Sequence, residues 1–65
     1  MEFNVSDMSC SKCAARIEKA IHTVDPQAHV EADVDAKRIS VTSTAAQDVI
    51  VKAVSEAGYT ATPAG

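Results

Sequence analysis

The sequence predicts an α+β fold whose elements follow the order β-α-β-β-α-β. Two helices are expected to cover one face of a four-stranded antiparallel sheet. Two observations support this prediction. Apolar residues recur at helical spacing in two segments, and in the shorter segments around them they alternate with polar residues. The chain has 65 residues, 46% of them hydrophobic, so we expect one folded domain over 1–65 with a thin margin of stability.

The first strand and the first helix are predicted within residues 1–24. In MEFNVS, Phe3 and Val5 alternate with polar residues, as in a strand with one buried face. From Cys13 onward the apolar residues follow helical spacing, and DPQ at 25–27 ends the helix because the residue before proline disfavours helical geometry. The predicted apolar face of this helix consists of Cys13, Ile17, Ala20, Ile21 and Val24.

A β-hairpin is predicted next. HVEADV (29–34) and RISVT (38–42) both alternate apolar and polar residues, and a short polar turn at 35–37 joins them. The residues expected to point inward are Val30, Ala32, Val34, Ile39 and Val41.

The second helix and a last strand complete the pattern. Thr44 followed by Gln47 resembles a capping box, and Gly58 is a favoured helix stop. The predicted apolar face of this helix is Ala46, Val49, Ile50, Ala53, Val54 and Ala57. YTAT (59–62) is short enough for an edge strand that Pro63 ends, and a loose tail is expected within 61–65. This order of elements is that of the ferredoxin-like split βαβ fold.

Charge and hydropathy exclude two classes of function. The formal net charge is −3 and the isoelectric point is about 5.1, whereas nucleic-acid binding requires a basic surface. No apolar run approaches the ~20 residues that span a bilayer, so no membrane insertion is expected. The start MEFNVSDM lacks a signal-peptide pattern, which predicts a cytoplasmic location.

The chemistry of the chain is concentrated in its two cysteines, Cys10 and Cys13, within DMSCSKC. They lie three positions apart at the start of the first predicted helix. The positive end of the helix dipole, together with the charges of Lys12 and Arg16, should favour a thiolate at Cys13. The sequence therefore predicts two closely spaced, exposed thiols that lose protons easily.

Four kinds of chemistry compete for this pair. A disulfide would close so short a loop that it would stabilise the fold weakly. A structural zinc site needs about four ligands, and His22 and His29 lack finger-like spacing to the pair and are expected to be solvated. Thiol–disulfide exchange remains an alternative, although the intervening Ser11-Lys12 contains neither proline nor glycine. Two thiolates that hold a soft ion such as Cu(I) are the favoured interpretation.

With MSCSKC after the first strand and EAGYTA after the second helix, the chain resembles the heavy-metal-associated domain family over essentially its whole length. The family motif is MxCxxC in a βαββαβ fold, and the chain looks most like small bacterial copper chaperones. The resemblance implies a non-enzymatic protein in which Cys10 and Cys13 bind Cu(I). It also implies transfer to related domains of a copper-transporting P-type ATPase. Ag(I) and Hg(II) would be surrogates, and Zn(II) is less favoured.

The resemblance also assigns roles around the cysteines. Met8 would anchor the loop in the core, Ser11 and Lys12 would support the loop, and Tyr59 would shield the metal or modulate its transfer. Two residues depart from the family pattern. Asp7 replaces a common glycine and is expected near Lys12 or Arg16. Ser9 stands where zinc- and cadmium-handling members often have aspartate.

A basic stripe is predicted along the first helix, from Lys12 through Arg16 to Lys19, as a docking surface for an acidic partner. Most acidic residues are expected elsewhere, around the hairpin: Asp25, Glu31, Asp33 and Asp35. The cysteines of two molecules could also share a metal in a bridged homodimer. An excised domain of a heavy-metal ATPase and a mercury-binding protein are alternatives that the same residues would fit.

Overall fold

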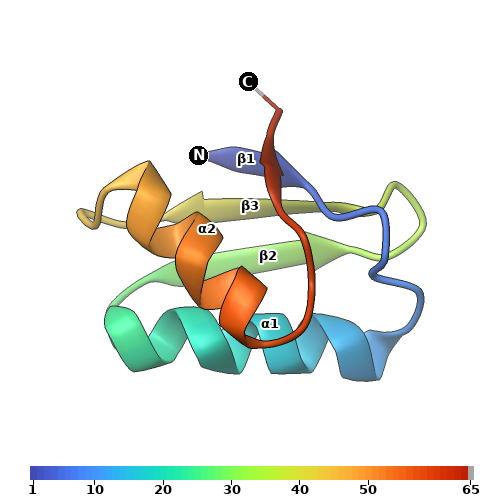
Figure 1. Cartoon of the computed structure of the whole chain (residues 1–65), viewed down its shortest axis with the longest axis horizontal. Helices are drawn as coiled ribbons and strands as arrows, with labels where there is room; N and C mark the ends of the chain where they lie inside the picture. Colours follow the sequence, from blue (N-terminus) through green and yellow to red (C-terminus); the bar gives the residue numbers. More distant parts are fainter. Residues whose placement is uncertain (65) are drawn as a thin grey trace.

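The computed structural model describes residues 1–64 and shows the predicted order of elements (Figure 1). The strands and helices are β1 (Glu2–Asn4), α1 (Ser11–Val24), β2 (His29–Asp33), β3 (Arg38–Thr42), α2 (Gln47–Glu56) and β4 (Thr62–Pro63). Within residues 1–64, neither helix is long and apolar enough to cross a membrane.

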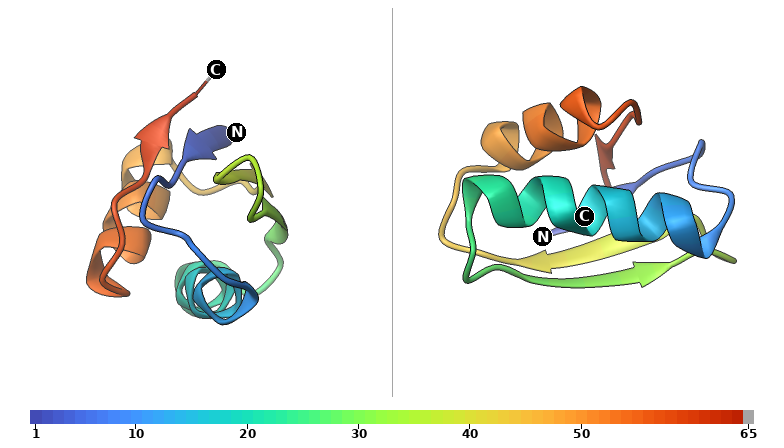
Figure 2. Two further views of the ribbon diagram at one scale, coloured as in Figure 1. Left: turned by 90° about the vertical axis from the view of Figure 1, so that its right-hand side faces the viewer. Right: turned by 90° about the horizontal axis from the view of Figure 1, so that it is seen from below.

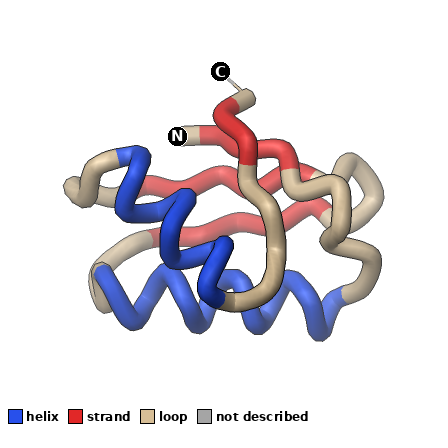
Figure 3. Tube along the Cα trace, viewed as in Figure 1, coloured by secondary structure: helices blue, strands red, loops and turns tan. Residues whose placement is uncertain are grey.

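The four strands form one antiparallel sheet in the order β2-β3-β1-β4. In β1, Phe3 lies opposite Ile39 of β3 on one side and opposite Pro63 of β4 on the other. Both helices lie on the same side of this sheet, as the right-hand view of Figure 2 shows, and Figure 3 distinguishes the helices from the strands by colour. The predicted ferredoxin-like α+β fold is confirmed.

The core lies between the sheet and the two helices. Because only one phenylalanine and one tyrosine are present, aliphatic side chains fill most of it. The large side chains that are fully buried are Phe3, Val5, Met8, Ile17, Ile21, Ile39, Val41, Ile50 and Val54. The helical and alternating spacings therefore identified most of the core correctly.

Four apolar residues expected to face inward are solvent-exposed: Val24, Ala32, Ala46 and Val49. Val24 ends α1 and is 45% exposed, and Val49 lies in the first turn of α2 and is 41% exposed. Ala32 is exposed on β2, an edge strand. At such ends and edges an element has packed neighbours on one side only, so apolar spacing overstates burial there.

The predicted capping box of Thr44 and Gln47 is not formed at the start of α2. The helix begins at Gln47 after Ala46, and no side chain caps it. The hydroxyl of Ser43 instead accepts a hydrogen bond from the N–H of Ala45 at 3.0 Å and donates one to the carboxylate of Asp25. A tertiary contact with the end of α1 thus holds the segment before α2, and the predicted cap at Thr44 is absent.

The C-terminal segment is more ordered than predicted. Strand β4 occupies 62–63 rather than 59–62, Ala61 is buried, and the N–H of Ala64 donates to the carbonyl of Glu2 at 2.8 Å. Pro63 is tolerated because β4 is an edge strand, where a missing N–H costs no ladder hydrogen bond. The expectation of a loose tail is thus wrong for 61–64, and its last residue lies outside the described residues.

Gly58 ends the second helical segment with φ of 95°, a region that side chains rarely adopt. A Cβ atom added there would meet nothing within 4 Å, so backbone strain is the sole cost of a substitution. We expect Gly58→Ala to lower the free energy of unfolding by roughly 1–2 kcal/mol in denaturant titrations. Gly58→Asn, which tolerates positive φ better, should lose less, and equal losses would contradict this explanation.

Candidate metal centre

Three connecting segments meet at one end of the molecule (Figures 1 and 2). They are the cysteine loop (residues 5–10), the β2–β3 turn (34–37) and the Tyr59 loop (57–61). Two long-range hydrogen bonds that involve a side chain join them. Lys37 donates through Nζ to the carbonyl of Met8, and the N–H of Thr60 donates to Oδ1 of Asp7, each at 3.3 Å. The cysteine loop is therefore held from both sides.

The structure brings Cys10 and Cys13 together at the start of α1. Cys10 immediately precedes the helix and is exposed, whereas Cys13 lies in its first turn and is half-buried against the core. Their Sγ atoms are 3.1 Å apart, well beyond the ~2.0 Å of a disulfide bond, and both are free thiols. The helix begins two residues earlier than the apolar spacing indicated.

The local environment lowers the pKa of the Cys13 thiol from 9.0 to about 6. The largest cause is a hydrogen bond with the side chain of Tyr59, followed by the thiol of Cys10 and the backbone of Ser9. The pKa of Tyr59 is raised, chiefly by the same contact with Cys13, while a hydrogen bond with Arg16 opposes the rise. The predicted thiolate bias is present, but hydrogen bonds cause it, chiefly the one with Tyr59, and not the expected charges of Lys12 and Arg16.

This shift in pKa predicts a pH-dependent stability of the metal-free protein. A thiol whose pKa is lower in the folded than in the unfolded state stabilises the fold. This contribution is fully present above the unfolded-state pKa of 9.0, and it is lost as the pH falls through the folded-state pKa of about 6. We expect the free energy of unfolding under reducing conditions to rise between these values. Denaturant titrations across this range test it, and Cys13→Ser should remove this rise. An identical rise in that variant would exclude Cys13 as its source.

Met8 is part of the cysteine loop, and its side chain is completely buried in the core. Its N–H donates to the carbonyl of Val5 at 3.0 Å, and its own carbonyl accepts from Lys37. Sequence reasoning missed Lys37. Its backbone has φ of 55°, an unusual value outside glycine, and its carbonyl accepts a hydrogen bond from the N–H of Val5 at 2.8 Å. Ser11 and Lys12 lie exposed in the first turn of α1.

Asp7 lies in the cysteine loop with an unexpected partner. Within residues 1–64 its carboxylate forms no ion pair with Lys12 or Arg16, and it accepts the hydrogen bond from Thr60 instead. The partner is 53 positions away in the sequence, so no local pattern could indicate it.

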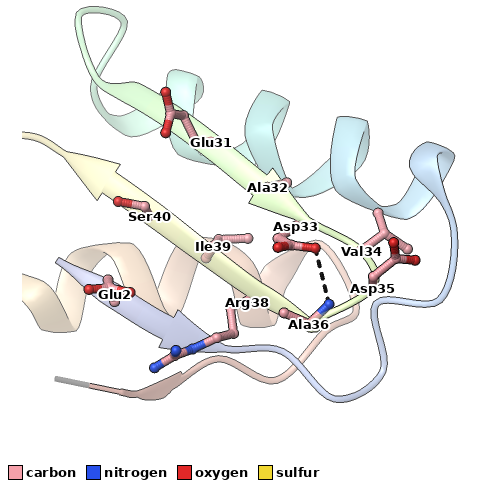
Figure 4. Close-up of a pocket in the computed structure, with 10 residues that line it drawn as sticks. All are labelled: Glu2, Glu31, Ala32, Asp33, Val34, Asp35, Ala36, Arg38, Ile39 and Ser40. Atoms are coloured by element: carbon pink, nitrogen blue, oxygen red, sulfur yellow. Dashed lines mark hydrogen bonds between the residues drawn. The ribbon is translucent and has the colours of Figure 1, made fainter.

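The basic stripe of Lys12, Arg16 and Lys19 is exposed along α1. Acidic side chains gather instead around a hollow beside the β2–β3 turn, which Figure 4 shows together with Arg38. The acidic residues of this hollow are Glu2, Glu31, Asp33 and Asp35. Asp25, predicted in that group, lies instead at the end of α1 beside Ser43.

The two histidines do not complete a metal site. His22 is half-buried, with Nε2 at 2.8 Å from the carbonyl of Ala28, so it is not the solvated residue that was expected. His29 is exposed, and its Nε2 lies 3.2 Å from Glu31. Across the described part of the chain, no three His, Cys, Asp or Glu side chains are placed to hold one ion. The candidate metal centre therefore consists of the two neighbouring thiols of Cys10 and Cys13.

A split βαβ domain with two adjacent thiols at the start of its first helix has the arrangement expected of a small metal-binding domain. The chain is a member of the heavy-metal-associated domain family, whose model matches residues 2–60.

Three known proteins are similar to this chain. The chain is 35% identical over 60 residues to a copper-transporting ATPase of Rhizobium meliloti; the match covers 89% of this chain but 7% of that much longer protein. A trimeric form of a mutant of the copper chaperone Atx1 from Synechocystis PCC6803 is 29% identical with a TM-score of 0.92, covering 95% of this chain and 98% of that one. A gold-binding protein is 31% identical with a TM-score of 0.90, covering 94% of each chain.

Proposed function

We propose that this chain is a soluble metallochaperone that binds Cu(I) through Cys10 and Cys13 and passes the ion to a copper-transporting P-type ATPase. The observation that carries the proposal is the pair of sulfur atoms 3.1 Å apart at the start of α1, with no third side-chain ligand beside them in residues 1–64. Thiolates select soft ions. Zinc in a structural site takes four ligands, which this site does not supply.

The relatives support this choice of metal and partner. Two of them handle copper and one binds gold, and both metals favour sulfur ligands as soft ions. The match to part of a copper-transporting ATPase supports a partner domain of the same fold. Two similar domains could approach each other with their cysteine loops facing.

Transfer requires exchange of ligands and no chemical transformation. A thiolate of the partner attacks the bound Cu(I), and Cys10 and Cys13 leave in turn through three-coordinate species, so the ion is never free. Cys10 is the more exposed ligand, which makes it the first to be displaced. Two copies of this chain could share an ion in the same way, as a metal-bridged homodimer.

Anaerobic titration with Cu(I) against a competing chelator tests the proposal. We expect tight one-to-one binding, followed by transfer when the N-terminal domain of a copper-transporting ATPase is added. Ag(I) should replace Cu(I), and Zn(II) should bind more weakly. Weak Cu(I) binding would contradict the proposal.

Thiol–disulfide exchange is the second candidate function. A thiol of lowered pKa beside another thiol is the arrangement that redox proteins use, and Cys13 with Cys10 fits it. Turnover with a disulfide substrate, together with weak Cu(I) binding, would favour this function over metal transfer.

The basic stripe predicts a salt-dependent rate of transfer. We expect Lys19→Glu to slow transfer to an acidic acceptor domain severalfold at low ionic strength, and high salt should reduce this difference because it screens surface charges. Lys19 serves better than Arg16 here, since Arg16 also contacts Tyr59. Lys52→Glu, an equal charge change on the exposed side of α2, is the matched control. Equal rates for both variants would refute docking through α1.

A further inference from the structure

The backbone on both sides of Tyr59 is fixed by hydrogen bonds of different origin. On the helix side, the N–H of Gly58 donates to the carbonyl of Ser55 at 3.0 Å and that of Tyr59 to Val54 at 3.2 Å, the pattern of a Schellman motif. On the other side, the N–H of Thr60 donates to the carboxylate of Asp7. The first anchor lies within one helix end, whereas the second joins the Tyr59 loop to the cysteine loop.

The contact of Asp7 with Thr60 has a direct consequence for the cysteines. The side chains of Tyr59 and Cys13 pack against the same buried core and contact each other, and the residue after Tyr59 is the one that Asp7 holds. A charged carboxylate is a stronger acceptor for an N–H group than a neutral one. Glycine, the residue expected here from the family pattern, has no side chain that could accept this bond.

We propose that Asp7 is a positioning residue: its carboxylate ties the Tyr59 loop to the cysteine loop and thereby holds the Tyr59 side chain against Cys13. The copper-related consequence rests on the proposed function, while the contact itself exists in the metal-free protein. By keeping Tyr59 beside one of the two metal ligands, Asp7 limits access of small competing ligands to that side of the site.

Two measurements on the metal-free, reduced protein test the contact directly. Asp7→Ala should speed hydrogen exchange of the Thr60 amide roughly two- to tenfold, the range expected for loss of one such hydrogen bond. Tyr59 is the sole tyrosine and the chain has no tryptophan, so its fluorescence can be read without interference. This fluorescence should rise in Asp7→Ala, because a sulfur atom in contact with a phenol quenches its emission.

Two controls separate positioning from a general effect of charge or stability. Asp7→Asn keeps an oxygen acceptor without the charge. It should retain most of the protection of the Thr60 amide and most of the quenching of Tyr59. Asp35→Ala removes a carboxylate from the exposed β2–β3 turn and should leave both signals unchanged. Unchanged Thr60 exchange in Asp7→Ala, or equal effects of Asp7→Asn and Asp7→Ala, would overturn the proposal.

The copper-loaded protein provides the functional readout. Asp7→Ala should speed removal of Cu(I) by a small chelator roughly two- to tenfold, and it should have no further effect in a Tyr59→Ala background. Additive effects of the two substitutions would mean that Asp7 does not act through Tyr59. If the protein fails to bind Cu(I), the proposed function fails, while exchange and fluorescence still decide whether Asp7 positions Tyr59.

Discussion

Replacement of either Cys10 or Cys13 by serine is expected to lower the affinity for Cu(I) by more than about 100-fold. Substitution of residues that merely orient a metal ligand typically costs 10- to 100-fold, and each of these changes removes one of two ligands outright. A serine hydroxyl is a hard oxygen donor that a soft ion disfavours. Competition with a Cu(I) chelator under anaerobic conditions measures the loss.

The two cysteine variants need a control that leaves the site intact. Ser55→Ala changes an exposed position of α2 and should keep wild-type affinity. Because Cys10 is exposed and Cys13 only half-buried, neither substitution should unfold the domain, and circular dichroism would verify this. A single-cysteine variant that retained wild-type affinity would show that the two sulfurs do not bind the ion together.

The fold and the cysteine pair could be predicted because their signals are local. Alternation in β3 places Ile39 and Val41 in the core, and helical spacing does the same for Ile17 and Ile21. A separation of three residues at the start of a helix brings two cysteine side chains together in any such fold. Short-range periodicity was thus sufficient for the layer arrangement and for the proposed ligands.

The parts that could not be predicted depend on contacts between distant segments. Asp7 meets Thr60, Lys37 meets Met8, and Asp25 meets Ser43 only after the chain has folded. The same cause explains the wrong capping box. The local pattern at Thr44 was compatible with a helix cap, but the end of α1 packs beside the start of α2, and Ser43 forms hydrogen bonds there instead. Around the site, the cysteine pair and the burial of Met8 were therefore predictable, whereas the long-range contacts of Asp7 and Lys37 were not.

Variants of Met8 distinguish most clearly between a side chain that binds the metal and one that anchors the cysteine loop in the core. Met8 is fully buried, and truncation of a buried methionine to alanine typically costs 2–5 kcal/mol. A domain of 65 residues has a total stability of roughly 3–10 kcal/mol, so Met8→Ala should remove a large part of it. Denaturant titration of the metal-free variant measures this loss.

Met8→Leu distinguishes the two roles, because it preserves volume and apolar character but removes the sulfur. If Met8 is an anchor, this variant should lose less than about 1.5 kcal/mol of stability and keep wild-type affinity for Cu(I). If the thioether binds the ion, affinity should fall although the fold is intact. Met8→Ala alone cannot make this distinction, since a collapsed cysteine loop would weaken binding in either case. We expect the leucine variant to bind normally, because the Met8 side chain packs in the core while the exposed Cys10 faces solvent.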